Sequence, residues 1–313
     1  MATDTFAFVL NPFHYAGDLP IELSPGVYLH HATNAQKEII ERFREELGLI
    51  GKSMILSFEP ILDESDRDRL LQARTTFWVI NFSGDSQPIW ELSHAAQLTD
   101  SELEVAAIFP PESSFRPREI NQWRVFYFCS ERWGRYNAQP LDYSDVILAG
   151  WLAGKLREFG LVDKNENSKR AVVRAFDDFV SLSREHRSGH LALLGHFALI
   201  EALVTHDPAK SGMSLTHQLR TKMPLLMRRF ARPLLVSEYF DLGDVRKAWE
   251  LLYDVRSRYA HGEEPDFEKA SKNKGVKELR DPRSVFRFVR ESLKRLIVLA
   301  LEEPQLIYDL KSC

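Results

Sequence analysis

The sequence predicts an α+β protein in which a mixed N-terminal part, residues 1–165, precedes an all-helical C-terminal part, residues 166–313. Short runs of aromatic and β-branched residues recur in the first part and are typical of strands. From Tyr143 onward, apolar residues recur at the 3.6-residue spacing of amphipathic helices. The charge also changes, because the first part holds 15 Lys and Arg against 24 Asp and Glu, whereas the second holds 26 against 21.

The composition is that of an ordinary globular protein. The chain has 313 residues, 44% hydrophobic and 27% charged, and is long enough for about two domains. Cys129 and Cys313 cannot build a disulfide framework, so we expect a reducing, cytoplasmic environment. The N-terminus lacks a basic export segment, and no apolar run approaches the ~20 residues of a membrane span. We therefore expect neither export nor membrane insertion.

The N-terminal part is predicted to contain both helices and strands. One helix should cover residues 33–47, because Thr33 and Asn34 are good cap residues and Gly48 can end a helix. A second helix is predicted over residues 63–73. The predicted strands are residues 6–10, 53–58, 75–82 and 123–128. This mixture indicates an α+β domain.

The C-terminal part is predicted to be a helical bundle. Ser214 is a cap residue, and Pro224 is expected to kink or end the helix that follows it. The polar, lysine-rich segment 263–283 is longer than an ordinary helix connection and is predicted to be a surface loop. The predicted helices, the first of which lies before the domain boundary, are residues 143–159, 169–186, 189–205, 214–227, 241–261 and 284–301.

One helix end carries the residues best suited to chemistry. The helix over residues 241–261 ends in His261 and Gly262, and glycine is favoured just past a helix C-terminus. A proton-exchanging His beside a phosphate-binding Arg256 is the minimum set for general acid–base cleavage of a phosphodiester. No metal is needed if the ribose 2′-OH of RNA is the nucleophile. The alternative is that Arg256 pairs with an acid such as Asp254 and His261 has no chemical role.

The residues around this helix end resemble a known family. Arg256 to His261 match the Arg-x4-His motif of the HEPN superfamily. The segment YDVRSRYAHG, residues 253–262, is similar to the YxxRS…HG signature of the ApeA-like HEPN group. Upstream, residues 198–203, ALIEAL, look like the LEALF-type helix of that group. The resemblance covers roughly residues 166–310.

The resemblance implies a helical ribonuclease domain that acts as a homodimer. In active relatives, two copies pair and bring both Arg/His motifs into one cleft. Carried over by position, Arg256 would bind the scissile phosphate, His261 would act as acid–base or transition-state stabiliser, and Ser257 would orient groups by hydrogen bonding. Many relatives act in prokaryotic toxin–antitoxin or antiphage systems, which implies an antitoxin or another defence protein as partner. The supporting residues would be Glu201, Arg258, Asp254 and Tyr253.

Glu201 is expected to need a cationic partner. Phe197 and Leu194 precede it by one and two helical turns, so its carboxylate projects from an apolar stripe. An unpaired charge there would be costly to bury. The candidate partners are Arg256, Arg258 and Arg220. The pair either joins two helices structurally or positions Arg256 for chemistry.

No metal ion or cofactor is predicted. His186, His190 and His196 lie in one region, but they do not form a His-Glu-x-x-His arrangement, and Gly189 interrupts the helix. The sequence has no Gly-rich phosphate loop, serine-nucleophile elbow or kinase motif.

Together these features predict a cytoplasmic ribonuclease. An N-terminal α+β regulatory or recognition domain would precede a HEPN-like domain that cleaves RNA by metal-independent transesterification, leaving a 2′,3′-cyclic phosphate and a 5′-OH. Two alternatives stay open. One is a non-catalytic HEPN module used for dimerisation or nucleotide binding, and the other is a helical interaction protein with a coincidental motif.

Overall fold

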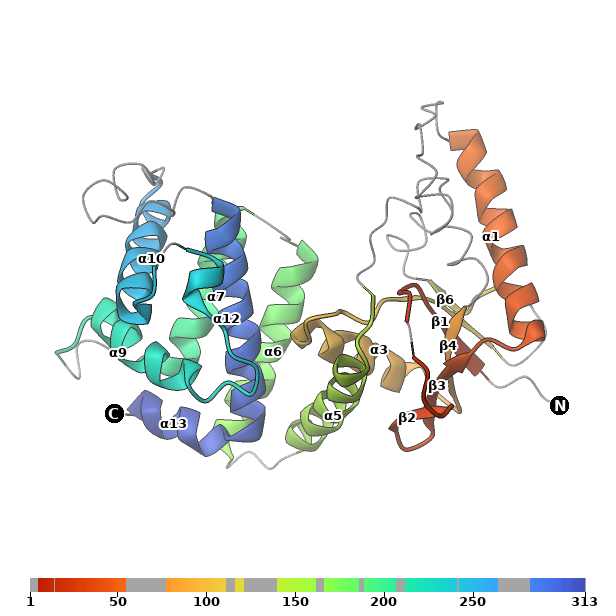
Figure 1. Cartoon of the computed structure of the whole chain (residues 1–313), viewed down its shortest axis with the longest axis horizontal. Coiled ribbons are helices and arrows are strands. Elements are labelled where there is room, and N and C mark those ends of the chain that lie inside the picture. The colour runs from red at the N-terminus through yellow and green to blue at the C-terminus, as the bar shows by residue number, and fades with distance from the viewer. Residues whose placement is uncertain are drawn as a thin grey trace. The chain divides into compact units, whose positions relative to one another are not determined.

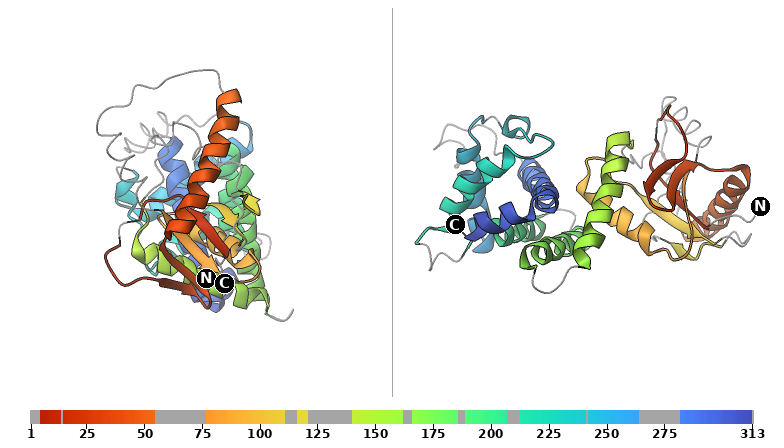
Figure 2. Two further views of the ribbon diagram at one scale, coloured as in Figure 1. Left: turned by 90° about the vertical axis from the view of Figure 1, so that its right-hand side faces the viewer. Right: turned by 90° about the horizontal axis from the view of Figure 1, so that it is seen from below.

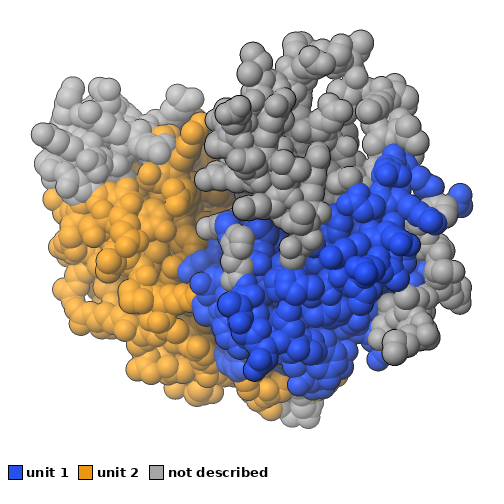
Figure 3. Space-filling view, turned by 45° about the vertical axis from the view of Figure 1, so that its right-hand side comes forward, with its two compact units in different colours: residues 1–154 blue, residues 155–313 orange. Residues whose placement is uncertain are grey.

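The computed structural model confirms the α+β class, with an antiparallel sheet near the N-terminus and a helical C-terminal part (Figure 1). The chain divides into two compact units, Met1–Gly154 and Lys155–Cys313 (Figure 3). The division falls inside helix α5 (Tyr143–Gly160), before the polar segment at which the charge changes. The structure describes residues 5–13, 15–54, 77–110, 116–120, 140–161, 166–185, 189–206, 212–240, 242–263 and 282–312.

A six-stranded sheet forms the centre of the N-terminal unit. Its order is β2-β3-β4-β1-β5-β6, and every neighbouring pair is antiparallel. The central strands are apolar along their length, as expected where both faces are covered. The strands are β1 (Thr5–Val9), β2 (Ile21–Ser24), β3 (Val27–His31), β4 (Trp78–Phe82), β5 (Val105–Phe109) and β6 (Glu119–Ile120).

Helix α1 (Asn34–Met54) packs on the sheet through aromatic side chains. Phe109 of β5 stacks on Phe6 of β1 at 5.0 Å and meets Phe43 of α1 edge-on at 5.4 Å. The predicted cap at Thr33 is present, because Thr33 and Gln36 exchange backbone-to-side-chain hydrogen bonds as a capping box. The aromatic contacts and the cap together fix this helix against the sheet.

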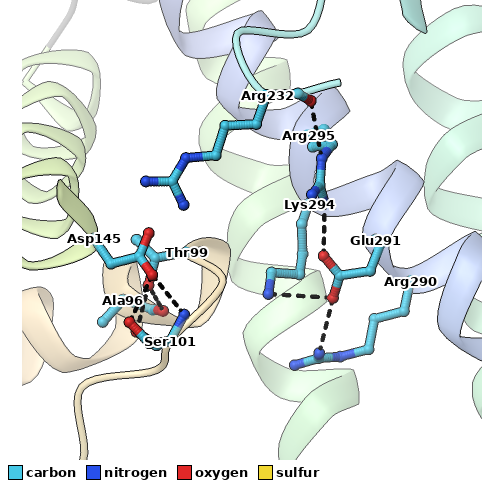
Figure 4. A network of polar contacts seen from close by, with 9 residues as sticks. All are labelled: Ala96, Thr99, Ser101, Asp145, Arg232, Arg290, Glu291, Lys294 and Arg295. Atoms are coloured by element: carbon cyan, nitrogen blue, oxygen red, sulfur yellow. Dashed lines mark hydrogen bonds and ion pairs between the residues drawn. The ribbon is translucent and has the colours of Figure 1, made fainter. Parts of the chain in front are cut away.

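Two further helices are described in this unit, α3 (Gln87–Ala95) with its short 3-10 extension Ala96–Leu98, and the start of α5. The buried Asp145 of α5 accepts hydrogen bonds from the backbone N–H and the hydroxyl of Ser101, at 2.8 and 2.6 Å (Figure 4). This contact ties α5 to the segment that follows α3.

Part of the N-terminal prediction was wrong. Gly48 does not end the first helix, which continues to Met54, so the strand predicted from Ser53 cannot begin there. A glycine inside a helix costs only about 1 kcal/mol relative to alanine, which the surrounding helical residues can offset. The predicted helix 63–73 and strand 123–128 lie outside the described residues.

The C-terminal unit is a bundle around α7 (His190–Val204), an almost wholly apolar helix that contacts five other helices of the described residues (Figures 1 and 2). Its aromatic core joins Phe197 of α7, Trp249 of α10 and Phe288 of α12, all fully buried. None of the described helices has the length and apolar character of a membrane-spanning segment. The other five are α6 (Asn167–Glu185), α9 (Leu215–Met227), α10 (Val245–Ala260), α12 (Pro282–Glu302) and α13 (Pro304–Ser312).

Helix α12 carries a compact charge network (Figure 4). Glu291 lies 2.7 Å from Arg295, 3.3 Å from Lys294 and 3.6 Å from Arg290. Lys294 is only 2% exposed. Burial acts to raise the pKa of Glu291, but these three cations outweigh it and hold that pKa below its usual range. The network therefore gathers three cations of α12 around one carboxylate of the same helix.

Candidate functional site

The end of α10 sets the backbone of the Arg-x4-His motif. Asp244 caps the start of the helix by accepting hydrogen bonds from the next turn. At the other end, the N–H of Gly262 donates to the Tyr259 carbonyl at 3.1 Å and that of Glu263 to the Arg258 carbonyl at 2.9 Å. This is a Schellman motif, and it needs the positive φ of 76° that Gly262 adopts. The exposed side chain of His261 is thus placed where the helix stops.

Arg256 pairs with Glu201 of α7, not with Asp254. Its Nη2 donates to Glu201 Oε2 at 3.1 Å, and the two side chains are 26% and 13% exposed. The third candidate partner of Glu201, Arg220, lies 3.4 Å from Glu250 instead. The ion pair therefore joins the motif helix to the central helix of the bundle.

The ion pair is made by a single hydrogen bond. Glu201 Oε1 and Arg256 Nε are both buried and have no hydrogen-bond partner among the described residues. Burial raises the pKa of Glu201, and the Arg256 guanidinium opposes that rise. The Arg256 guanidinium is therefore the group that favours the ionised form of this carboxylate.

Tyr253 lies one turn before Arg256 and covers its guanidinium. The Arg256 guanidinium carbon is 5.5 Å from the centre of the Tyr253 ring, within cation–π range. Burial raises the pKa of the Tyr253 phenol, Arg256 lowers it and Glu201 raises it. The phenol therefore stays protonated at neutral pH, and its ring lies beside both members of the ion pair.

The remaining motif residues are less enclosed. Ser257 is half-buried, and its carbonyl accepts from the backbone N–H of His261 at 3.1 Å. Asp254 and Arg258 are exposed. No hydrogen bond or ring contact joins Arg256 to His261 in the described part of the chain. One copy of the motif therefore presents its arginine and its imidazole as separate groups.

A ring contact beside the motif was not predicted from the sequence. His190, the first residue of α7, stacks on Tyr259 with ring centroids 5.9 Å apart and an angle of 26° between the planes. From the sequence, His190 stood out only as a candidate metal ligand. Nothing in the sequence indicates this contact, because it depends on how α7 and α10 pack.

The histidines do not form a metal site in the described residues. No group of three His, Cys, Asp or Glu side chains there is placed to hold a metal ion, and His186 lies outside those residues. His196 is buried, with the rings of Phe179 and Phe286 at 6.0 and 5.4 Å. Burial, to which the charge of Arg290 adds, lowers the pKa of His196 to about 4. His196 is therefore a neutral core residue at neutral pH.

No protein-family model matches this sequence, and the searches of curated proteins and of solved structures also found no match. The HEPN resemblance therefore rests on the motif residues and on the helix end that carries them.

Proposed function

We propose that the protein is a metal-independent endoribonuclease of the HEPN type, active as a homodimer. The observation that supports this best is the geometry of the end of α10. Arg256 is partly exposed and held by one hydrogen bond, and the exposed His261 follows at the point where the helix stops. A cation for the phosphate and an imidazole that can transfer protons are thus offered near one end of one helix.

In this mechanism, Arg256 binds the non-bridging oxygens of the scissile phosphate. His261 takes the proton of the ribose 2′-OH or gives a proton to the departing 5′-oxygen. The 2′-oxygen forms a bond to phosphorus as the bond to the 5′-oxygen breaks, which leaves a 2′,3′-cyclic phosphate and a 5′-OH. Ser257 contributes by orienting groups through hydrogen bonds.

The homodimer belongs to the proposal because one motif offers only one imidazole. Transesterification benefits from both a base at the 2′-OH and an acid at the leaving oxygen. Two motifs across a twofold axis supply both groups. Activity should then fall on dilution below the dimer dissociation constant, and full specific activity in a monomeric sample would refute the composite site. An antitoxin or another defence protein is the proposed regulator.

An RNA-cleavage assay with and without EDTA tests the function. We expect His261→Ala to abolish cleavage, whereas His217→Ala, which removes an exposed histidine of α9, should leave it unchanged. Arg256→Ala should lose as much cleavage activity as His261→Ala. The double variant should be only slightly less active than either single variant, because the two residues act as a unit. Wild-type cleavage by His261→Ala would refute the assignment.

One observation favours a second function, a non-catalytic module that binds partners or nucleotides. In the described structure Arg256 is engaged by Glu201, as in an ion pair that joins two helices. Retained dimerisation without RNA cleavage, unchanged by removal of His261, would favour this alternative.

A further inference from the structure

The Arg256–Glu201 ion pair lacks the second hydrogen bond that a strong arginine–carboxylate pair makes. A guanidinium usually binds a carboxylate by two parallel hydrogen bonds, one to each oxygen. Here Nη2 donates to Oε2, whereas Nε and Oε1 are buried without partners. Arg256 is therefore held less firmly than in a bidentate pair.

Arg256 would lose few contacts if its side chain moved away from Glu201. Its side chain is 26% exposed and can reach solvent. It would lose one hydrogen bond and the 5.5 Å contact with the Tyr253 ring, and its Nε would become free to bind an acceptor. A phosphodiester presents two oxygens that match two guanidinium donors. A phosphate that binds Arg256 can therefore accept from both Nη2 and Nε, whereas Glu201 accepts from Nη2 alone.

The Glu201 side chain, in contrast, would stay largely buried if Arg256 moved towards solvent. It is 13% exposed, on the central helix of the bundle. A carboxylate buried without a cation is strongly disfavoured, and such groups take up a proton instead. Loss of Arg256 therefore shifts Glu201 towards its protonated, neutral form.

The surrounding helices do not replace Arg256. Among the described residues, burial raises the pKa of Glu201, and Arg256 is the charge that opposes this rise. Tyr253, the other titratable group beside the pair, stays neutral. On the helices that pack against α7, Arg220 of α9 pairs with Glu250, and Arg290 and Lys294 of α12 pair with Glu291. Lys311 of α13 donates to the backbone carbonyl of Ala202, the residue after Glu201 on α7. Asp177 of α6 is an acid and cannot take the place of the Arg256 cation.

We propose, building on the proposed ribonuclease function, that an RNA phosphate takes Arg256 from Glu201 and that Glu201 then takes up one proton from solvent. Glu201 is in this view a positioning residue that holds the arginine near the site until RNA arrives. RNA binding then becomes tighter as pH falls, because the bound state carries one proton more than the free state.

Calorimetry of the full chain tests this exchange. An oligoribonucleotide with 2′-O-methyl groups throughout cannot undergo transesterification, so it reports binding alone. Titration at one pH in buffers of different ionisation enthalpy gives the number of protons taken up. We expect an uptake of up to one proton for the wild type and near zero for Glu201→Gln, which should also bind about fivefold more tightly because no carboxylate competes for Arg256.

Two control variants assign the proton. Glu250→Gln removes a carboxylate paired with Arg220 outside the site and should behave like the wild type. His261→Ala should take up protons on RNA binding as the wild type does. This variant still tests the inference if Glu201→Gln does not fold. Loss of the uptake in His261→Ala would place the proton on His261 and overturn the inference.

The outcomes separate this inference from the proposed function. RNA cleavage that depends on His261, together with binding that is independent of pH and unchanged in Glu201→Gln, would overturn the exchange and leave the ribonuclease standing. Proton-coupled binding without cleavage would support the exchange and refute the enzyme. Absence of RNA binding by the wild type would overturn both.

Discussion

Arg256→Ala should destabilise the fold through the charge that it leaves behind. Glu201 would lose its cation while 13% exposed. Removing one partner of a fully buried pair costs about 3–5 kcal/mol, and because this pair has one hydrogen bond and partial exposure we expect about 2 kcal/mol at pH 8. In the double variant with Glu201→Gln no charge is stranded, so about 1 kcal/mol should be recovered.

The loss of stability in Arg256→Ala should depend on pH, and the direction of this dependence follows from the pKa of Glu201. Without Arg256, the effect that opposes the rise of the Glu201 pKa is gone, so the pKa of the folded state rises further above its value in the unfolded chain. The ionised form is then the costly one, and the destabilisation should shrink as pH falls through the folded-state pKa.

Urea unfolding followed by circular dichroism, from pH 8 to pH 5, measures both effects. Arg246→Ala, in the exposed first turn of α10, is the matched control and should change stability by less than about 0.5 kcal/mol. A double variant as unstable as Arg256→Ala, or a loss that does not depend on pH, would refute the stranded charge as the cause.

Three further outcomes can be checked on the same protein. Because the pKa of His196 is lowered to about 4, the fold should lose stability as pH falls from about 6.5 towards 4, and His196→Leu should flatten that part of the urea-midpoint profile; an unchanged slope would contradict this. Glu291→Gln should cost about 3 kcal/mol in thermal unfolding, because three cations including the buried Lys294 lose their shared carboxylate, and a loss below about 1 kcal/mol would count against the network. Gly262→Ala should cost about 1 kcal/mol through its positive φ and lower hydrogen-exchange protection at the end of α10, whereas unchanged protection would disprove the Schellman end.

Local chemistry made much of the C-terminal unit predictable. The 3.6-residue spacing placed α6, α7, α10 and α12 to within a few residues, and Ser214 caps α9 as predicted by accepting from the N–H of His217. Pro224 was expected to kink or end that helix, and it does not end it, because α9 continues to Met227. The sequence signals of a helix lie within its own segment, so a helix can be predicted without knowledge of the tertiary fold.

The N-terminal unit was harder to predict because its strands are short and depend on their neighbours. The hairpin of β2 and β3 was missed, although Gly26 with a φ of 78° marks its turn. Strand β5, VAAIF, contains two alanines and gains its stability from burial between β1 and β6. Sheet contacts of this kind are not visible in a single segment.

The candidate site was predictable in its residues and not in its contacts. The sequence indicated that Glu201 needs a cation, but three arginines were open as partners. The choice of Arg256 depends on the packing of α7 against α10, which brings together residues 55 positions apart. The single hydrogen bond and the stacking of His190 on Tyr259 depend on the same packing.

Because α10 ends in a Schellman motif, substitution of His261 and substitution of Arg256 should affect the stability of the fold differently. Its hydrogen bonds are made by backbone groups, so the His261 side chain is placed without contributing to the fold. The fold therefore does not require a histidine at position 261, whereas loss of Arg256 leaves Glu201 without its cation. Under the proposed function, descendants that lose the activity should change the histidine first and keep the arginine with its glutamate.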